Sequence, residues 1–212
     1  MSQLDHQPSN QPATTVGVIL AGGQSSRMGQ DKALLEYQDE RLIDRAVGKI
    51  AAQVDHVIIN RGKVIGGLQR LVHVPDATPD YQGPLAGILA CLKWTLDHHD
   101  DNAVLVTAPV DSPFIPMDLV ARLLDNPAPV SFAASQGRRH PVIGKWQAGL
   151  APRLQALFDA GERKIDRAAT HFGFEEVEWP LTEHPDLGPC DPFENINTPD
   201  EFEAIRNRRN TA

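Results

Sequence analysis

An apolar segment that breaks into glycines near the start of the chain constrains the fold more than any other feature. The segment runs from Val16 to Leu20 and is rich in β-branched residues, a composition typical of a strand buried in a parallel sheet. Gly22 and Gly23 follow at once, and glycines at such a point let the backbone turn tightly or approach a ligand closely. The segment therefore predicts the first strand of a parallel sheet, with a special loop at its carboxyl end.

This loop also carries two cations, Arg27 and Lys32. Backbone N–H groups in a glycine-rich loop attract anions, and fixed cations beside them strengthen the attraction, so we expect the loop to bind phosphate. It is not a Walker loop, because Gln30 follows Gly29, and the adjacent Gly22 and Gly23 do not fit the dinucleotide fingerprint. A glycine-rich turn can also serve only as a tight connection between a strand and a helix. The two cations favour phosphate binding.

The order of residues 20–32, Leu-Ala-Gly-Gly-Gln-Ser-Ser-Arg-Met-Gly-Gln-Asp-Lys, resembles the signature loop of the nucleotidyltransferases that activate molybdopterin and sugar phosphates. The resemblance extends over 16–205, and its specific parts include Pro-Leu-Ala-Gly at 84–87 and Asn-Ile-Asn-Thr-Pro at 195–199. The motif at 195–199 and the adjacent Gly22 and Gly23 resemble the guanylyl-transferring branch of these enzymes. This resemblance implies transfer of GMP from GTP to the phosphate of molybdopterin, the molybdenum cofactor. Cytidylyl transfer, or another small phosphate acceptor, is the alternative.

Length and composition fit one soluble α/β domain. The chain has 212 residues, of which 41% are hydrophobic and 23% are charged. Strand-like and helix-like segments alternate, which predicts a mostly parallel sheet with helices on both faces, the Rossmann-like nucleotidyltransferase fold. We expect this domain to span 16–208, after a disordered polar tail at 1–15. The pattern also predicts a helix from about Pro116 to Leu124, a strand at 142–146 and a loop at 182–192.

Charge and cysteine content exclude several classes of protein. The net charge of −8 argues against a nucleic-acid-binding protein, and no apolar stretch approaches the roughly 20 residues needed to span a bilayer. The tail lacks the apolar centre of a signal peptide. Cys91 and Cys190 are far apart and form no metal or redox motif, so they predict a reducing compartment. We therefore expect a cytoplasmic protein that binds neither membranes nor nucleic acids.

Three polar residues follow predicted strands: Asn60, Asp76 and Asp111. Ligands of open parallel sheets bind at the carboxyl ends of the strands, so these side chains are candidates for a nucleotide site. Asn60 and Asp76 could instead cap local turns. Asp111 could cap the next helix, or it could bind a divalent cation, which prefers oxygen ligands.

The resemblance assigns roles to these residues. It implies a Mg²⁺ ion on Asp111 and a catalytic set of Arg27, Lys32 and Asp111. The residues that it implies for GTP binding are Leu20, Ala21, Gly22, Gly23, Lys32, Asn60, Asp76 and Asp111.

A second cluster of candidates lies in the second half of the chain. The order Arg138-Arg139-His140-Pro141 is the strongest cationic cluster after the loop, although a charge run is usually a solvated turn. The resemblance implies that Arg138 and His140 contact the acceptor, together with Asn195 and Asn197. Asn197 could equally cap a final helix.

Two other classes of function remain compatible with the sequence. One is a regulator that binds GTP without transferring it, which the presence of both Lys32 and Asp111 disfavours. The other is a protein that hands the cofactor to molybdoenzymes or to their chaperones, an activity that could coexist with catalysis.

Overall fold

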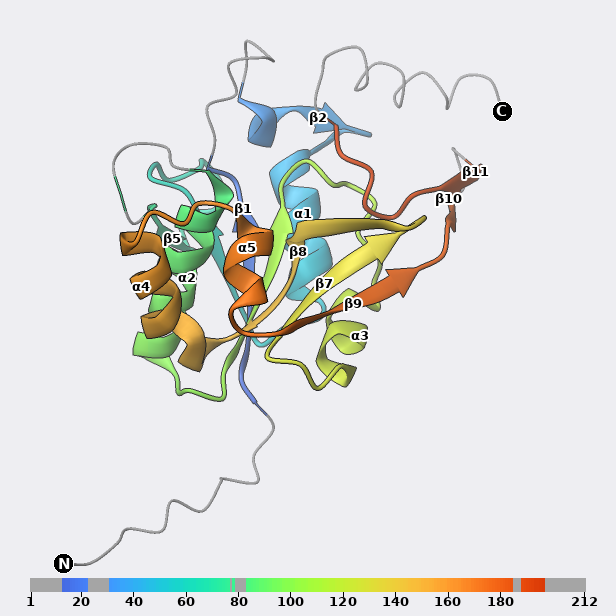
Figure 1. Cartoon of the computed structure of the whole chain (residues 1–212). Coiled ribbons are helices and arrows are strands. Elements are labelled where there is room, and N and C mark those ends of the chain that lie inside the picture. Colours follow the sequence, from blue (N-terminus) through green and yellow to red (C-terminus); the bar gives the residue numbers. More distant parts are fainter. Residues whose placement is uncertain (1–12, 23–30, 77, 79–82, 185–187, 197–212) are drawn as a thin grey trace, which may run out of the picture.

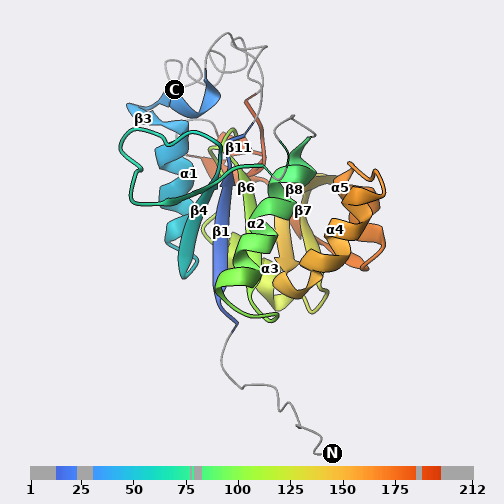
Figure 2. The ribbon, with the colours of Figure 1, turned by 90° about the vertical axis from the view of Figure 1, so that its left-hand side faces the viewer.

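The computed structural model describes residues 13–22, 31–76, 78, 83–184 and 188–196. Within them, a central sheet lies between two layers of helices (Figures 1 and 2). The expectation of an α/β fold with helices on both faces is confirmed. The predicted tail at 1–15 lies mostly outside the described residues, but Thr15 already belongs to the first strand.

The sheet has seven strands in the order β5-β4-β1-β6-β8-β7-β9. Their bounds are β1 Thr15–Leu20, β4 His56–Asn60, β5 Val72–Val74, β6 Val104–Pro109, β7 Val130–Ser135, β8 Arg138–Gln147 and β9 Phe174–Trp179. β1 pairs in parallel with both β4 and β6, and β4 pairs in parallel with β5. These four strands therefore deliver their carboxyl ends to one edge of the sheet.

Strand β8 runs antiparallel to both β6 and β7. It begins at Arg138, earlier than the predicted strand at 142–146, and its pairing with β7 shifts register between Phe132 and Ala133. Pro141 lies in this shifted part, which is where a residue without an N–H can be accommodated in a strand. Arg138 and Arg139 thus belong to the strand, and the turn before it is formed by Gln136 and Gly137, which both have positive φ.

The helices cover the sheet in two groups, each with its own apolar core. Residues of α1 Leu42–Ala51 and α3 Leu119–Asp125 are buried with Ile19, Ile59 and Val106 on one face. Those of α2 Pro84–His98, α4 Ala151–Asp159 and α5 Ile165–Thr170 are buried with Val18 and Phe132 on the other. Helix α3 starts at Leu119, later than predicted, because 116–118 form a turn that the N–H of Leu119 closes.

Short elements complete the fold. A 3-10 helix, η1 Lys32–Leu34, precedes the hairpin of β2 Glu36–Tyr37 and β3 Glu40–Arg41, and η2 Ala148–Leu150 leads into α4. The loop predicted at 182–192 is wrong in part, because Thr182–His184 and Gly188–Cys190 pair as the antiparallel strands β10 and β11. These strands are too short to show an alternating pattern. Among the described residues, no helix combines the length and the apolar character needed to cross a membrane.

Candidate functional site

Backbone hydrogen bonds hold together the segments that leave β1, β4 and β6 at the upper edge of the sheet in Figure 1. The N–H of Ala21 donates to the carbonyl of Asn60 at 3.2 Å, and the N–H of Val110 donates to the carbonyl of Leu20 at 3.2 Å. The start of the glycine loop is therefore fixed between its two neighbours. The predicted site residues on these three segments are therefore held in fixed positions relative to one another.

The side chain of Asn60 is buried at this edge, with 3% of its surface exposed. Its Nδ2 donates to the carbonyl of Val74 at 3.1 Å and to Oδ1 of Asp76 at 2.9 Å. Both partners come from the end of the neighbouring strand, so the alternative of a local turn cap is wrong for Asn60. The carboxamide has a fixed orientation, and Asp76 is held beside it.

Two glycines make room for this carboxamide. A Cβ atom placed on Gly87, in the first turn of α2, would lie 2.1 Å from Oδ1 of Asn60, and a Cβ atom on Gly22 would lie 3.3 Å from the same oxygen. The first distance is far shorter than any real carbon–oxygen contact. Gly87 is part of the motif at 84–87, but its closeness to Asn60 could not be read from the sequence.

The predicted cation and the predicted metal ligand lie side by side. Nζ of Lys32 donates to Oδ2 of Asp111 at 3.1 Å, and each side chain is 18% exposed. Asp111 precedes α3, which starts only at Leu119, so the alternative of a cap for that helix is wrong. This arrangement combines a positive charge, a carboxylate and access to solvent at the strand ends.

Three of the predicted site residues, Gly23, Arg27 and Asn197, lie outside the described residues. The remaining nucleotide candidates, Leu20 to Gly22, Lys32, Asn60, Asp76 and Asp111, come together from four segments of the chain. Their association was predicted from the rule that strand ends meet, and the contacts above bear out that part of the prediction.

The donor set fits a metal ion that is held largely by substrate. Among the described residues, no three side chains of His, Cys, Asp or Glu are grouped to hold an ion by themselves. Mg²⁺ is often bound by one or two carboxylates with substrate phosphates and water completing its shell. Asp111 uses one oxygen for Lys32, and its second oxygen can serve such an ion.

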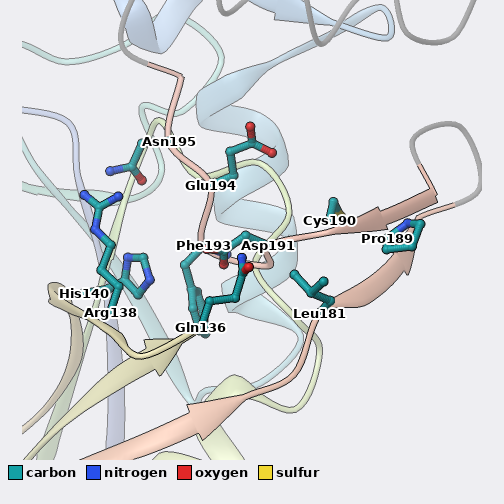
Figure 3. A pocket seen from close by; sticks show the side chains of 10 residues that line it. All are labelled: Gln136, Arg138, His140, Leu181, Pro189, Cys190, Asp191, Phe193, Glu194 and Asn195. Atoms are coloured by element: carbon teal, nitrogen blue, oxygen red, sulfur yellow. The ribbon is translucent and has the colours of Figure 1, made fainter.

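A pocket of about 540 Å³ lies at the start of β8, between that strand, the β10–β11 hairpin and the segment that follows the hairpin. Figure 3 shows Arg138 and Asn195 on one side of the pocket and Leu181 and Pro189 on the other. One wall can therefore contact anions and polar groups, while the other is apolar. The structure brings together three of the four predicted acceptor residues, Arg138, His140 and Asn195.

His140 lines this pocket with a fixed pattern of hydrogen bonds. The hydroxyl of Ser135 donates to Oδ1 of Asp191 at 2.8 Å and lies 2.8 Å from Nε2 of His140. Since the hydroxyl has one proton, Nε2 of His140 must donate to it. Burial lowers the pKa of His140, a shift that Asp191 opposes and Arg138 adds to. The neutral ring therefore carries its proton on Nε2 and leaves Nδ1 as an acceptor.

The segment after the hairpin links this pocket to the strand ends. The N–H of Ile196 donates to the carbonyl of Asp111 at 2.9 Å, and the hydroxyl of Ser112 donates to Oδ1 of Asn195 at 2.5 Å. No local sequence pattern marks Ser112, Ser135 or Asp191 as site residues. Ser112 lies 83 positions from Asn195, and Ser135 lies 5 positions from His140 and 56 from Asp191. The two halves of the candidate site are thus joined at Asp111.

Comparison with known proteins gives consistent results. The family described as MobA-like NTP transferase domain matches residues 17–173. A protein of Rhizobium rhizogenes named molybdenum cofactor guanylyltransferase is 40% identical over 197 residues, which cover 90% of each chain. A protein of Rhodopseudomonas palustris with the same name is 39% identical over 212 residues, covering 95% of this chain and 94% of the relative.

Solved structures share the fold. Molybdopterin-guanine dinucleotide biosynthesis protein A from Archaeoglobus fulgidus superposes with a TM-score of 0.69 at 21% identity, covering 94% of this chain and all of the other. A 4-diphosphocytidyl-2C-methyl-D-erythritol synthase gives a TM-score of 0.65 at 11% identity. Together with the sequence relatives, these matches establish that the chain belongs to the MobA-like NTP transferase family.

Proposed function

We propose that the protein transfers GMP from GTP to the phosphate of molybdopterin and releases pyrophosphate. The observation that carries this proposal is the strand order β5-β4-β1-β6-β8, which places the Lys32–Asp111 pair, beyond β1 and β6, between the ends of β4 and β5 and the start of β8. Asn60 and Asp76 lie on one side, and the pocket with Arg138 and Asn195 lies on the other. Relatives named molybdenum cofactor guanylyltransferase, at 36–40% identity over most of the chain, support the choice of substrates.

The nucleotide would occupy the strand ends. In this proposal the backbone of Leu20, Ala21, Gly22 and Gly23 approaches the nucleotide, and Asn60 with Asp76 recognises the guanine. Asn60 uses both hydrogens of Nδ2 on Val74 and Asp76, so the pair offers acceptors, Oδ1 of Asn60 and Oδ2 of Asp76, to the N–H groups on the polar edge of guanine. A site built to pair with such an edge rejects other bases strongly, because its buried groups would be left unpaired.

The acceptor would occupy the pocket, with its phosphate toward Asp111. Arg138, His140, Asn195 and Asn197 are its proposed contacts. An oxygen of the acceptor phosphate attacks the α-phosphorus of GTP, the new P–O bond forms, and pyrophosphate departs with the electrons of the old one. The attacking group is already an anion, so no general base is needed, and the protein acts by positioning and by stabilising charge.

Lys32 and Arg27 would stabilise the negative charge that develops on the triphosphate and on the departing pyrophosphate. Asp111 would hold a divalent cation, for which we propose Mg²⁺. When bound, such an ion neutralises phosphate oxygens at the reacting centre. The family of nucleotidyltransferases supports a divalent metal in general terms, and the carboxylate chemistry of Asp111 supports Mg²⁺.

We further propose that 16–208 act as one catalytic domain in the cytoplasm. Cys91 and Cys190 are both buried free thiols, which is compatible with a reducing compartment. Delivery of the product to molybdoenzymes or their chaperones is a separate activity that the transfer reaction does not require.

A panel of nucleotides tests the proposal. The protein is incubated with molybdopterin, Mg²⁺ and GTP, CTP or ATP, and both pyrophosphate and the dinucleotide product are measured. We expect rapid turnover with GTP and at least a hundredfold less with CTP or ATP, which is the discrimination expected when polar groups are left unpaired. Equal turnover of CTP would support the cytidylyl alternative, and GTP binding without pyrophosphate release would support the silent regulator.

A further inference from the structure

An arginine–carboxylate pair joins the end of the glycine loop to the residue that follows β4. Arg61 directly follows Asn60, and Asp31 directly precedes Lys32. Nη1 of Arg61 donates to Oδ1 of Asp31 at 3.1 Å, and Nη2 of the same guanidinium donates to Oδ2. Such a bidentate pair fixes orientation as well as distance.

Each partner is also fixed by its own backbone surroundings. Asp31 is the N-cap of η1, and its Oδ1 accepts from the N–H of Ala33 at 3.2 Å. The N–H of Arg61 donates to the carbonyl of Val74 at 2.9 Å, which continues the pairing of β4 with β5. The side-chain hydrogen bonds from Arg61 lower the pKa of Asp31, so the carboxylate is charged at neutral pH. The pair therefore connects two anchored backbones.

The pair lies next to the two residues that would hold the ends of the nucleotide, Lys32 and Asn60. The side chain of Lys32 projects from η1 to Asp111, while the carboxamide of Asn60 projects from the end of β4 to Asp76. A nucleotide that spans both would be held by its base at one end and by its phosphates at the other. Efficient transfer needs these two contacts at a fixed separation, because a misplacement of about 1 Å can cost about a hundredfold in rate.

We propose that the Asp31–Arg61 pair is a positioning element of the transfer reaction: it sets the distance between the phosphate-binding Lys32 and the base-binding Asn60. This inference rests on the proposed function. Both residues act through their neighbours, so they are positioning residues and make no contact with substrate. A surface ion pair by itself is worth little stability, so its removal should affect turnover much more than folding.

The chain contains a matched control at the start of helix α1. Arg41 and Asp44 form a second bidentate pair, in which Nε donates to Oδ2 at 2.5 Å and Nη2 donates to Oδ1 at 2.9 Å. The exposed fractions of its side chains are 26% and 32%, against 20% and 32% for Arg61 and Asp31. Asp44→Asn removes the same charge from the same kind of pair without touching η1 or β4.

The test compares Asp31→Asn with Asp44→Asn in the full chain. We expect Asp31→Asn to lower kcat with GTP and molybdopterin by about ten- to a hundredfold, while Asp44→Asn stays within about twofold of the unchanged protein. Thermal unfolding midpoints of the two variants should agree within a few degrees. Equal turnover of the two variants would overturn the proposal and make the pair an ordinary ion pair.

A double-mutant cycle separates positioning from direct contact. If Asp31 and Arg61 act as one unit, then Asp31→Ala, Arg61→Ala and the double variant lose similar factors in kcat. Multiplicative losses would mean that one residue acts on the substrate by itself, which contradicts the proposal. Restoring most of the lost kcat with Arg61→Lys would also contradict it, because lysine cannot form the bidentate geometry.

Hydrogen exchange gives a readout that does not depend on the reaction. The amides of Leu34 and Leu35 donate to carbonyls at the start of η1, so they should exchange at least tenfold faster in Asp31→Asn than in Asp44→Asn. Unchanged exchange of these two amides would show that the Asp31–Arg61 pair does not anchor η1, which would overturn the proposal. If the unchanged protein released no pyrophosphate while exchange still rose in Asp31→Asn, the proposed function would fail and the anchoring would stand.

Discussion

Nζ of Lys32 lies 3.1 Å from Oδ2 of Asp111, although the two residues are 79 positions apart in the chain. The contact joins the end of the glycine loop to the segment that leaves β6. Asp111 accepts from this lysine through one carboxylate oxygen, which leaves its other oxygen for a second cation. A reacting phosphate placed here would lie near both the positive charge of Lys32 and the carboxylate of Asp111 that would hold a metal ion.

Asp111→Asn should give a folded protein that has lost most of its transfer activity. The substitution preserves the shape of the side chain, but a neutral ligand holds Mg²⁺ less well than a carboxylate does. We expect the residual activity to need a higher Mg²⁺ concentration, which a titration of pyrophosphate release against Mg²⁺ will measure. Full turnover with an unchanged Mg²⁺ dependence would place the metal elsewhere.

Lys32→Ala should impair turnover without a comparable loss of stability. Removing one preorganised charge from a reacting centre commonly costs about 10²–10³ in kcat. Lys63→Ala, which removes an exposed lysine from the segment after β4, is the control and should behave like the unchanged protein. Rates at saturating GTP and molybdopterin provide the measurement, and near-normal turnover of Lys32→Ala would show that Lys32 does not face the phosphates.

Gly87→Ala should weaken GTP binding by displacing the carboxamide of Asn60. The added Cβ would lie 2.1 Å from Oδ1 of Asn60, and the carboxamide can move only by giving up its bonds to Val74 and Asp76. We expect KM for GTP to rise at least tenfold and the preference for GTP over CTP to fall. Steady-state kinetics with both nucleotides will measure these changes.

Gly48→Ala is the matched control for this substitution. Gly48 also lies within a helix, and a Cβ atom there would meet nothing within 4 Å. The change should stabilise the protein by about 0.5–1 kcal/mol, because alanine is favoured over glycine inside helices, and it should leave the kinetics unaltered. If the two variants had the same KM for GTP, then Asn60 would not bind the nucleotide or would tolerate displacement.

Stability should fall as the pH drops through the range in which His140 would be protonated in the unfolded chain. Burial lowers the pKa of folded His140 below its ordinary value of 6.5, so the unfolded chain takes up this proton first. The folded state is therefore favoured above pH 6.5 and loses this advantage as the pH falls toward the lowered pKa. Thermal unfolding between pH 7.5 and pH 5, at about half-unit steps, will measure the effect.

His140→Gln is the control for the titration. Glutamine can still donate to Ser135 but does not titrate, so the stability of this variant should depend less steeply on pH. His99, whose pKa is also lowered by burial, titrates in both proteins and cancels in the comparison. Identical slopes in the two proteins would contradict the assignment of a neutral His140.

Much of the proposed nucleotide side of the site could be predicted from the sequence, because it follows from one rule. Apolar runs identify the buried strands, and the carboxyl ends of parallel strands meet. This is why Asn60, Asp76 and Asp111 were found before any contact was known. The contacts of these residues could not be predicted. The hydrogen bond from Asn60 to Asp76 and the space beside Gly87 depend on how β5 and α2 pack against the end of β4.

The proposed acceptor side was predicted less well for physical reasons. Strand β8 carries Pro141 and a shift in register, so its start was placed too late. The strands β10 and β11 have three residues each, too few to show a period of two. The link from Ser135 to Asp191 joins a buried strand to a segment 56 positions away. Resemblance identified Arg138, His140 and Asn195, while the sequence offered no sign of the residues that hold His140.

The segment beyond β9 has a consequence for how the chain can be divided. The region of the chain that matches the family, 17–173, ends before most of the residues that line the pocket at the start of β8. Trp179, Phe193 and Ile196 of this later part are almost completely buried in the core beneath α1 and α3. A protein shortened to the matched region would keep Lys32 and Asp111 but would lose these three side chains from its core. The region that defines membership of the family is therefore smaller than the smallest piece that can fold with a complete site.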